Sequence, residues 1–257
     1  MIIDTHAHLT DKHFAELEPY LEKAREAQVL GLLAVATTAK DSRECIELSE
    51  RHSQIRASVG IHPNYCHEAE EGDWEIIEKL CIDPRVAALG ETGLDKYWDD
   101  CPWEIQVDYF RRHLALSRDT NLPVIIHTRE CAQETLEILT REYREFGPIR
   151  GVMHSFTGPH EVALGCLELG LYISFAGMLT FKNAQEIRDI AKEIPEDRLL
   201  VETDSPYLTP HPFRGQRPNH PALVAETLSC LAETRGISKT DCAAITTRNA
   251  ERLFGSW

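Results

Sequence analysis

This sequence of 257 residues lacks the features of a disulfide-stabilised or membrane-spanning protein. Its eight cysteines are scattered, with no CxxC pair and no framework spacing, so we expect reduced and mostly buried thiols. No apolar run approaches the roughly 20 residues that cross a bilayer, and the first residues show no basic stretch followed by an apolar one. We therefore expect no membrane association and a cytoplasmic location.

Positive charge is also scarce. The chain has 27 Lys plus Arg against 42 Asp plus Glu, a formal net charge of −15 at pH 7. Proteins that clamp long nucleic acids through a general basic field need a face of Lys and Arg that releases many counterions. The composition excludes that mode of binding, so any phosphate must be held by something local and cationic.

Linkers rich in Gly, Pro or Ser, low-complexity segments and residue-level repeats are absent too. The composition, with 42% hydrophobic and 27% charged residues, is typical of globular proteins. Single α/β barrels commonly have about 250 residues. We expect one domain over residues 1–257, and no sequence feature indicates an obligate protein partner.

Short β-rich runs alternate with longer amphipathic stretches along almost the whole chain. The helical stretches have apolar spacing near 3.6 residues; the first is expected at 13–27, and two more, 221–235 and 239–254, follow the last strand. Eight strand–helix units favour a (β/α)8 TIM barrel with extra C-terminal helices over an open doubly wound sheet. The expected strands are 2–5, 31–37, 56–60, 86–90, 123–126, 151–153, 171–175 and 199–202.

Polar residues follow the ends of these strands, where a barrel has its catalytic mouth. The set is His6, His8, His62, Glu91, His127, His154 and Asp204. Neutral imidazoles and carboxylates on one rigid mouth form a cage for divalent metal, and such cages accept Mg, Mn or Zn. Even without His62, four histidines and two carboxylates exceed the three protein ligands of a typical catalytic zinc. We therefore expect two ions bridged by Glu91, an arrangement suited to phosphodiester hydrolysis.

Six motifs and the C-terminal segment resemble the TatD family of metal-dependent deoxyribonucleases. The resemblance covers nearly the whole chain, although the HxH start alone is shared with the wider amidohydrolase superfamily. The block after Asp95, KYWDDC, departs from the family's usual aromatic pair followed by Arg. The matching segments are IDTHAHL (3–9), GIHP (60–63), GETGLD (90–95), PVIIHTR (123–129), HSFTG (154–158), ETDSPYL (202–208) and NAERLF (249–254).

The resemblance implies a TIM barrel with two divalent cations that cleaves DNA, often as a 3′–5′ exonuclease preferring single strands. By motif match, one cation would be held by His6, His8 and Asp204, the other by His127 and His154, and both by Glu91. Asp204 would also orient or deprotonate the attacking water. Glu202 is expected either to orient a ligand or to be a carboxylate paired within the barrel.

Three residues are expected to contact substrate phosphate: His62, Arg129 and Arg214. The alternative role for His62 is direct metal binding. Arg129 could instead form a salt bridge with a loop carboxylate such as Asp95. The loop 210–221, which contains Arg214 and four prolines, is expected at the mouth, where Phe213 or Tyr207 could stack on a base. The other reading of this loop is a solvated connection to the last helices.

Two other functions fit parts of the sequence. An amidohydrolase-like enzyme acting on another ester or amide, such as a lactonase or an aminoacyl-tRNA deacylase, would share the metal cage. It would have no need for Arg129 and Arg214, which favour a phosphate substrate. A non-catalytic metal-binding module is disfavoured by six ligands on an open mouth, because structural zinc sites are closed and four-coordinate.

Overall fold

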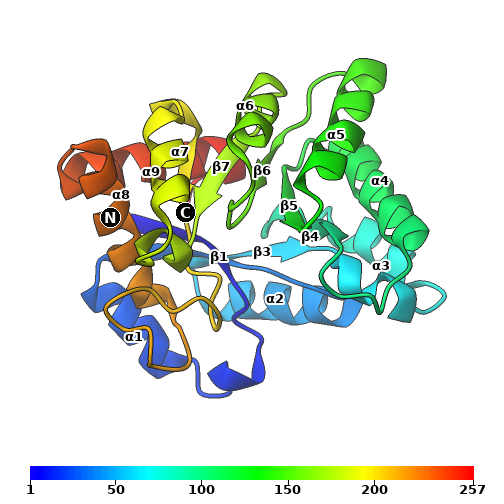
Figure 1. Ribbon diagram of the computed structural model, residues 1–257. Coiled ribbons are helices and arrows are strands. Elements are labelled where there is room, and N and C mark those ends of the chain that lie inside the picture. The colour runs from blue at the N-terminus through cyan, green and yellow to red at the C-terminus, as the bar shows by residue number, and fades with distance from the viewer.

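The computed structural model describes residues 1–257 and forms a (β/α)8 barrel, as the sequence predicts (Figure 1). All eight strands are parallel and follow one another around a single sheet in chain order. The strands are β1 Ile2–Ala7, β2 Val29–Ala34, β3 Ile55–Val59, β4 Val86–Asp95, β5 Val124–Arg129, β6 Gly151–Met153, β7 Tyr172–Phe175 and β8 Leu199–Val201.

The sheet closes between β1 and the segment that follows β8. Asp204 donates its backbone N–H to the carbonyl of His6 at 2.9 Å, and His8 donates to the carbonyl of Ser205 at 2.8 Å. The closure therefore places the first and last polar motifs of the chain side by side at one end of the barrel.

Helices surround the barrel and one of them closes its base. The side chains of Ala250, Leu253 and Phe254 from α9 pack against barrel-interior residues such as Ile3 and Leu200. This apolar plug fills the amino ends of the strands, so the opposite end remains open for the polar residues. The helices are α1 Glu18–Glu26, α2 Ala39–Arg51, α3 Asp73–Leu80, α4 Trp103–Thr120, α5 Ala132–Phe146, α6 His160–Glu168, α7 Gln185–Glu193, α8 Val224–Arg235 and α9 Lys239–Phe254.

The structure moves several expected boundaries. The first helix begins at Glu18 instead of residue 13, because Pro19 has no N–H and is tolerated only in the first helical turn. The preceding residues Lys12–Phe14 form a short 3-10 turn capped by Asp11. β2 begins at Val29 and ends at Ala34, short of the expected residue 37.

The boundary change that bears on the cavity lengthens β4 from Gly90 to Asp95, and this places Glu91 inside the strand instead of after it. Two glycines make the strand look interrupted in the sequence, but they are needed where backbones approach closely. A Cβ on Gly90 would lie 2.8 Å from the carbonyl oxygen of Ile125, and one on Gly93 only 2.1 Å from that of His127. β4 can therefore pair with β5 up to the register Asp95 opposite Arg129.

Most cysteines and one histidine outside the cavity are buried. All eight cysteines are free and seven are buried, as expected. His113 is fully buried in α4, where its Nε2 accepts from the backbone N–H of Ile61 at 3.2 Å. Its position on the inner face of a long helix explains the burial.

None of the helices combines the length and the apolar character that a membrane span requires.

Candidate metal centre

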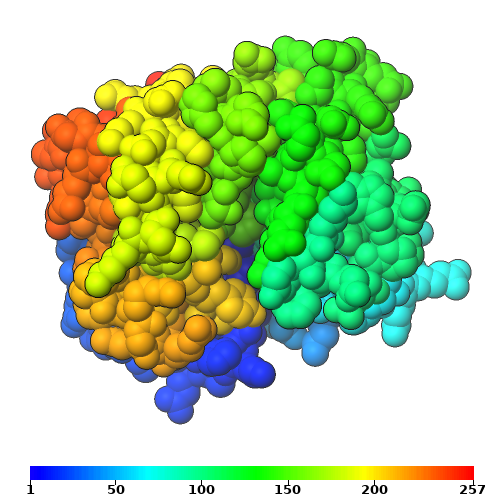
Figure 2. Space-filling model, viewed as in Figure 1, coloured from blue at the N-terminus to red at the C-terminus, as the bar shows by residue number.

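The carboxyl ends of the strands open onto a cavity of 940 Å³. Figure 2 shows this hollow between the yellow-orange segment that follows β8 and the green segments around β5 and α5. His6 is fully buried at the bottom of this cavity. We call six polar residues the floor of the cavity: His6, His8, Glu91, His127, His154 and Asp204.

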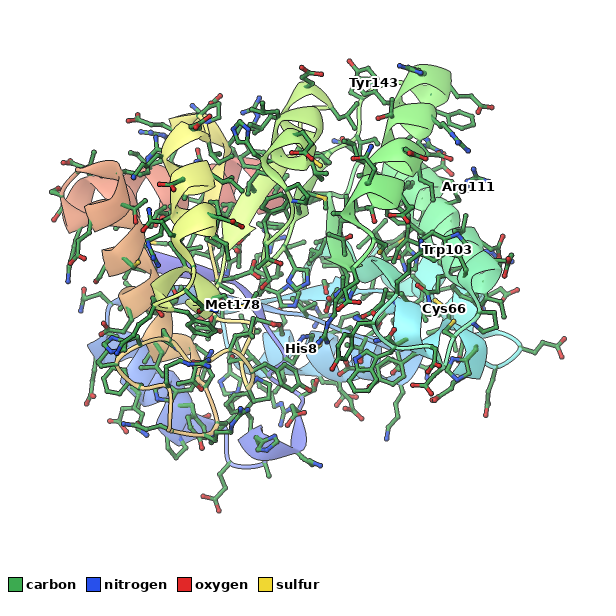
Figure 3. All side chains as sticks on the ribbon, in the orientation of Figure 1. His8, Cys66, Trp103, Arg111, Tyr143 and Met178 are labelled. Carbon is green, nitrogen blue, oxygen red and sulfur yellow. The ribbon has the colours of Figure 1, made fainter.

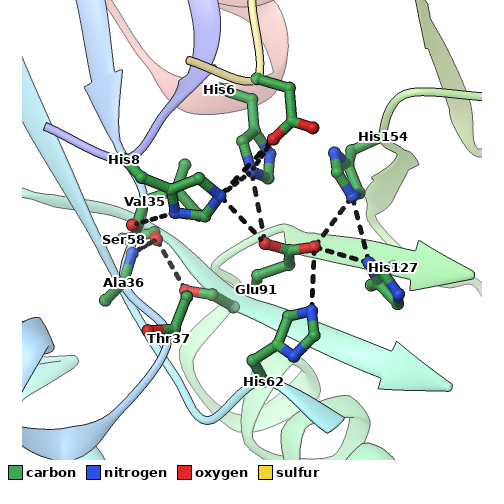
Figure 4. A network of polar contacts seen from close by, with 12 residues as sticks. His6, His8, Val35, Ala36, Thr37, Ser58, His62, Glu91, His127 and His154 are labelled. Carbon is green, nitrogen blue, oxygen red and sulfur yellow. Dashed lines mark hydrogen bonds and ion pairs between the residues drawn. The ribbon is translucent and has the colours of Figure 1, made fainter. Parts of the chain in front are cut away.

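Glu91 stands at the centre of the floor, and its two carboxylate oxygens face two different groups of ligands (Figure 4). Oε2 lies 3.4 Å from Nε2 of His6 and 3.6 Å from Nε2 of His8. Oε1 lies 2.8 Å from Nδ1 of His127 and 2.8 Å from Nε2 of His154. One buried carboxylate therefore joins both halves of the floor.

Hydrogen bonds to adjacent segments of the barrel fix Glu91 in this position. Its N–H donates to the carbonyl of Ala36 at 2.9 Å. The preceding carbonyl, of Gly90, accepts from the hydroxyl of Ser58 at 2.6 Å. Because both partners belong to the neighbouring part of the barrel, the orientation of the carboxylate depends on sheet packing and not on loop flexibility.

His6, His8 and Asp204 form the first half of the floor. The Nε2 atoms of His6 and His8 are 3.3 Å apart, and they lie 3.6 Å and 3.5 Å from Oδ1 of Asp204. Nδ1 of His8 donates to the carbonyl of Val35 at 3.1 Å, which orients the ring. Burial alone would lower the pKa of His8, but the carboxylates of Asp204 and Glu91 outweigh it and raise that pKa to about 9.

His127 and His154 form the second half, and each is oriented by a further carboxylate. Nε2 of His127 contacts Oδ2 of Asp95 at 2.9 Å, and Nδ1 of His154 contacts Oε1 of Glu202 at 3.1 Å. Each ring thus directs its other nitrogen to Glu91, the arrangement by which outer carboxylates fix the tautomer of a ligating histidine. Glu202 is buried and paired with His154, a position that agrees with both expectations for this residue.

The charged groups of the floor shift one another's pKa values in opposite directions. Burial alone would raise the pKa of Glu91, but His154, His62 and His6 hold it well below its usual range. Burial disfavours the charged form of His154, yet Glu91 and Glu202 outweigh that effect and raise its pKa well above the ordinary value. Carboxylates that are ionised at this depth provide an environment that favours positive charge.

The donor set and its spacing fit a small divalent cation. Four ligands about 2.1 Å from one ion at tetrahedral angles lie about 3.4 Å from one another. In the first half of the floor, the separations of His6, His8, Asp204 and Glu91 given above range from 3.3 to 3.6 Å. Two imidazole nitrogens facing each other at 3.3 Å cannot both donate a proton, but both can donate a lone pair to a shared cation.

The three residues expected to contact phosphate all line the cavity. Nδ1 of His62 accepts from the backbone N–H of Asn64 at 3.1 Å, so the neutral ring carries its proton on Nε2, 3.5 Å from Oε1 of Glu91. The guanidinium carbon of Arg129 lies 3.6 Å from the ring centre of Tyr97. That of Arg214 lies 3.7 Å from the ring centre of Phe181.

We call six exposed side chains the rim: Tyr65, Trp98, Arg129, Tyr207 and Arg214, which line the cavity, and Tyr97, which packs against Arg129. Of the two aromatic residues expected to stack on a base, Tyr207 lines the cavity and Phe213 does not.

Sequence reasoning missed Asp95. The salt bridge considered between Asp95 and Arg129 is not formed, because Oδ2 of Asp95 contacts His127 while Oδ1 accepts from the N–H groups of Tyr97 at 2.8 Å and Trp98 at 3.1 Å. Asp95 therefore touches both the floor and the rim. The available signal was its place at the end of the GETGLD motif, but recognising it requires that β4 continue past Gly90.

Comparisons with known proteins agree with this geometry. A family model described as TatD related DNase matches residues 3–255. The chain is 41% identical over 255 residues to an uncharacterized metal-dependent hydrolase, YabD, of Bacillus subtilis, with 99% of each chain covered. It is 32% identical over 259 residues to a protein of Erwinia tasmaniensis named 3′-5′ ssDNA/RNA exonuclease TatD, covering 98% of this chain and 99% of the relative.

A solved structure agrees as well. The crystal structure of the TatD homologue YjjV from Escherichia coli superposes with a TM-score of 0.93 at 29% identity, covering 100% of this chain and 98% of that one. The full-length family match, the curated relatives and this superposition lead to one conclusion. The chain belongs to the TatD family and is a metal-dependent hydrolase.

Proposed function

We propose that this hydrolase is a 3′–5′ exonuclease that removes nucleotides from single-stranded DNA with the help of two divalent ions. The observation that carries the proposal is Glu91, whose two oxygens each face a separate pair of histidines. The name of the Erwinia tasmaniensis relative supports the reaction and the polarity. Its name also includes RNA, which the experiment below tests.

In this proposal His6, His8 and Asp204 would hold one ion, His127 and His154 would hold the other, and Glu91 would offer one oxygen to each. Mg, Mn and Zn all suit this mixture of imidazole and carboxylate. When bound, two such ions supply an activated water and neutralise charge on the phosphate oxygens.

The protein's own groups carry out the proton transfer and hold the substrate. Asp204, at the edge of the floor, accepts the proton of the attacking water as general base. The Nε2–H of His62 donates to a phosphate oxygen beside Glu91. Arg129 and Arg214 contact neighbouring phosphates as guanidinium forks.

Cavity size and total charge favour a strand end over a long duplex. A volume of 940 Å³ lies within the range of pockets that enclose small ligands, so it holds a few nucleotides. A net charge of −15 disfavours broad electrostatic clamping of a long duplex outside the cavity. Binding is therefore concentrated at the cations and the arginines of the mouth.

The test uses metal-stripped protein given Mg, Mn or Zn, with 5′-labelled and 3′-labelled single-stranded DNA, duplex DNA and RNA as substrates. We expect the 5′-labelled strand to shorten stepwise, the 3′-labelled strand to release its label at once, and the duplex to react more slowly. Aminoacyl-tRNA and a lactone serve as control substrates. Hydrolysis of either control with no reaction on any nucleic acid would show that the proposal is wrong.

A further inference from the structure

Exposed aromatic side chains gather around the cavity. Six aromatic residues of the chain are substantially exposed, and four of them belong to the rim: Tyr65, Tyr97, Trp98 and Tyr207. Scattered exposed apolar side chains are normal, but side chains of this kind that gather in one place mark a binding surface. Their concentration at the one cavity that holds the candidate metal centre indicates a role in binding substrate.

Tyr97, Trp98 and Arg129 form a compact cluster on this rim. The guanidinium carbon of Arg129 lies 3.6 Å from the ring centre of Tyr97 and 5.9 Å from that of Trp98. The two aromatic rings are nearly perpendicular, at 88°, with centroids 4.9 Å apart. Trp98 itself remains 49% exposed and lines the cavity, so one of its surfaces is free for a ligand.

Contacts at the base of the cluster hold it in place. The two hydrogen bonds to Oδ1 of Asp95 fix the backbone of residues 97 and 98. The ammonium of Lys96 pairs with Glu134 and lies 4.8 Å from the ring centre of Trp103. Because Asp95 also contacts His127, the cluster stands at a fixed position relative to the floor.

We propose that Tyr97, Trp98 and Arg129 form a nucleotide subsite in which Trp98 stacks on an unpaired base and Arg129, backed by Tyr97, contacts the adjoining phosphate. This inference rests on the proposed function and names the residues that read the strand. Stacking on a flat aromatic surface tolerates every base. A base paired within a duplex offers no free face to Trp98, so this subsite selects single strands.

The experiment measures binding of a fluorescent single strand with phosphorothioate linkages, which resist hydrolysis, to the metal-loaded protein by anisotropy. We expect Trp98→Ala to weaken binding roughly tenfold, the scale of one lost base stack. Trp98→Phe keeps a ring and should stay within about threefold of the unchanged protein. Phe146→Ala is the matched control, because Phe146 is 50% exposed and lies in a groove with Arg111, which Figure 3 shows well away from His8.

A second strand, abasic at its three 3′-terminal positions, separates stacking from a structural effect. We expect the unchanged protein and Trp98→Ala to bind this strand equally. An equal loss on both strands, or no loss on the normal strand, would overturn the subsite. If Trp98→Ala binds normally while the unchanged protein still shortens single strands, the subsite is wrong and the proposed function stands. If the unchanged protein neither binds nor shortens any strand, both are wrong.

Discussion

The floor and the rim of the cavity are built in contrasting ways. Floor residues such as His6 and Glu91 are buried and come from strands, where backbone hydrogen bonds to adjacent segments of the barrel fix them. Rim residues such as Trp98 and Tyr207 are about half exposed and come from loops. The barrel therefore keeps the reactive geometry rigid, and the loops adapt the same centre to a particular substrate. Substitutions in the floor should change catalysis or metal binding, and those in the rim should change substrate affinity.

The largest expected effect comes from Asp204→Asn in the floor. Removing the proposed general base should lower kcat by about 10²- to 10⁴-fold with a smaller change in substrate affinity. Single-turnover digestion of a 5′-labelled strand, with metal content measured on the same samples, checks this. Asp11→Asn is the control, because Asp11 also lines the cavity but pairs with His13. A kcat within tenfold of the unchanged protein would assign the proton transfer to another group.

A second effect concerns His113, which supports the floor from behind. Burial lowers the pKa of His113 from 6.5 to about 4. The carbonyl of Tyr109 opposes this shift and the charge of Arg112 adds to it. Between pH 6.5 and about pH 4, His113 is therefore protonated in the unfolded chain but neutral in the folded chain. The contribution of His113 to the free energy of unfolding is fully present above pH 6.5. It falls by about 3 kcal/mol as the pH decreases to about 4.

Urea unfolding of the metal-loaded protein between pH 7.5 and pH 4.5 checks this behaviour. The unchanged protein should lose more stability over this range than His113→Gln, which cannot titrate. Parallel pH profiles for the two proteins would contradict the prediction.

A third effect concerns Asp95, whose replacement should change metal binding at the floor but not substrate binding at the rim. In Asp95→Asn one oxygen can still accept from the N–H groups of Tyr97 and Trp98, but the amide nitrogen cannot accept from His127. We expect metal affinity to fall about 10- to 100-fold, as for other lost partners of ligating histidines, with substrate affinity at saturating metal little changed. Calorimetric titration with Mn checks this, and Asp99→Asn in the same exposed loop is the control. Unchanged metal affinity would show that Asp95 does not orient His127 for metal binding.

The smallest expected effect belongs to the rim. Arg214→Ala removes an exposed cation stacked on Phe181, so we expect KM for single-stranded DNA to rise roughly fivefold at unchanged kcat. Arg144→Ala, in the groove beside Phe146, should change neither constant. A fall in kcat without a change in KM would move Arg214 from substrate binding to the chemical step.

The residue types and their order along the chain were sufficient to predict the barrel and the candidate ligands. Eight strands were found near their expected positions, because alternating β-rich and amphipathic runs report local preference. The strand-end positions of His6, His8, His127 and His154 follow from the same reading. The parallel arrangement then brings all strand ends to one mouth, whatever the details of the loops.

Other properties depended on contacts between distant segments. The continuation of β4 past two glycines is set by its pairing with β5, and it places Glu91 between two histidine pairs. The same register brings Asp95 to His127, 32 residues away in the chain. The burial of His113 likewise follows from the packing of α4 against β4 and against the segment that follows β3.

The sequence by itself thus determined the fold class and a set of metal-binding residue types, since both follow from local periodicity and spacing. Only the tertiary structure decided which oxygen of Glu91 faces which histidines, and which aromatic residues stand beside the floor. Those relations arise from strand register and loop anchoring, and these depend on hydrogen bonds and close backbone contacts between residues far apart in the chain.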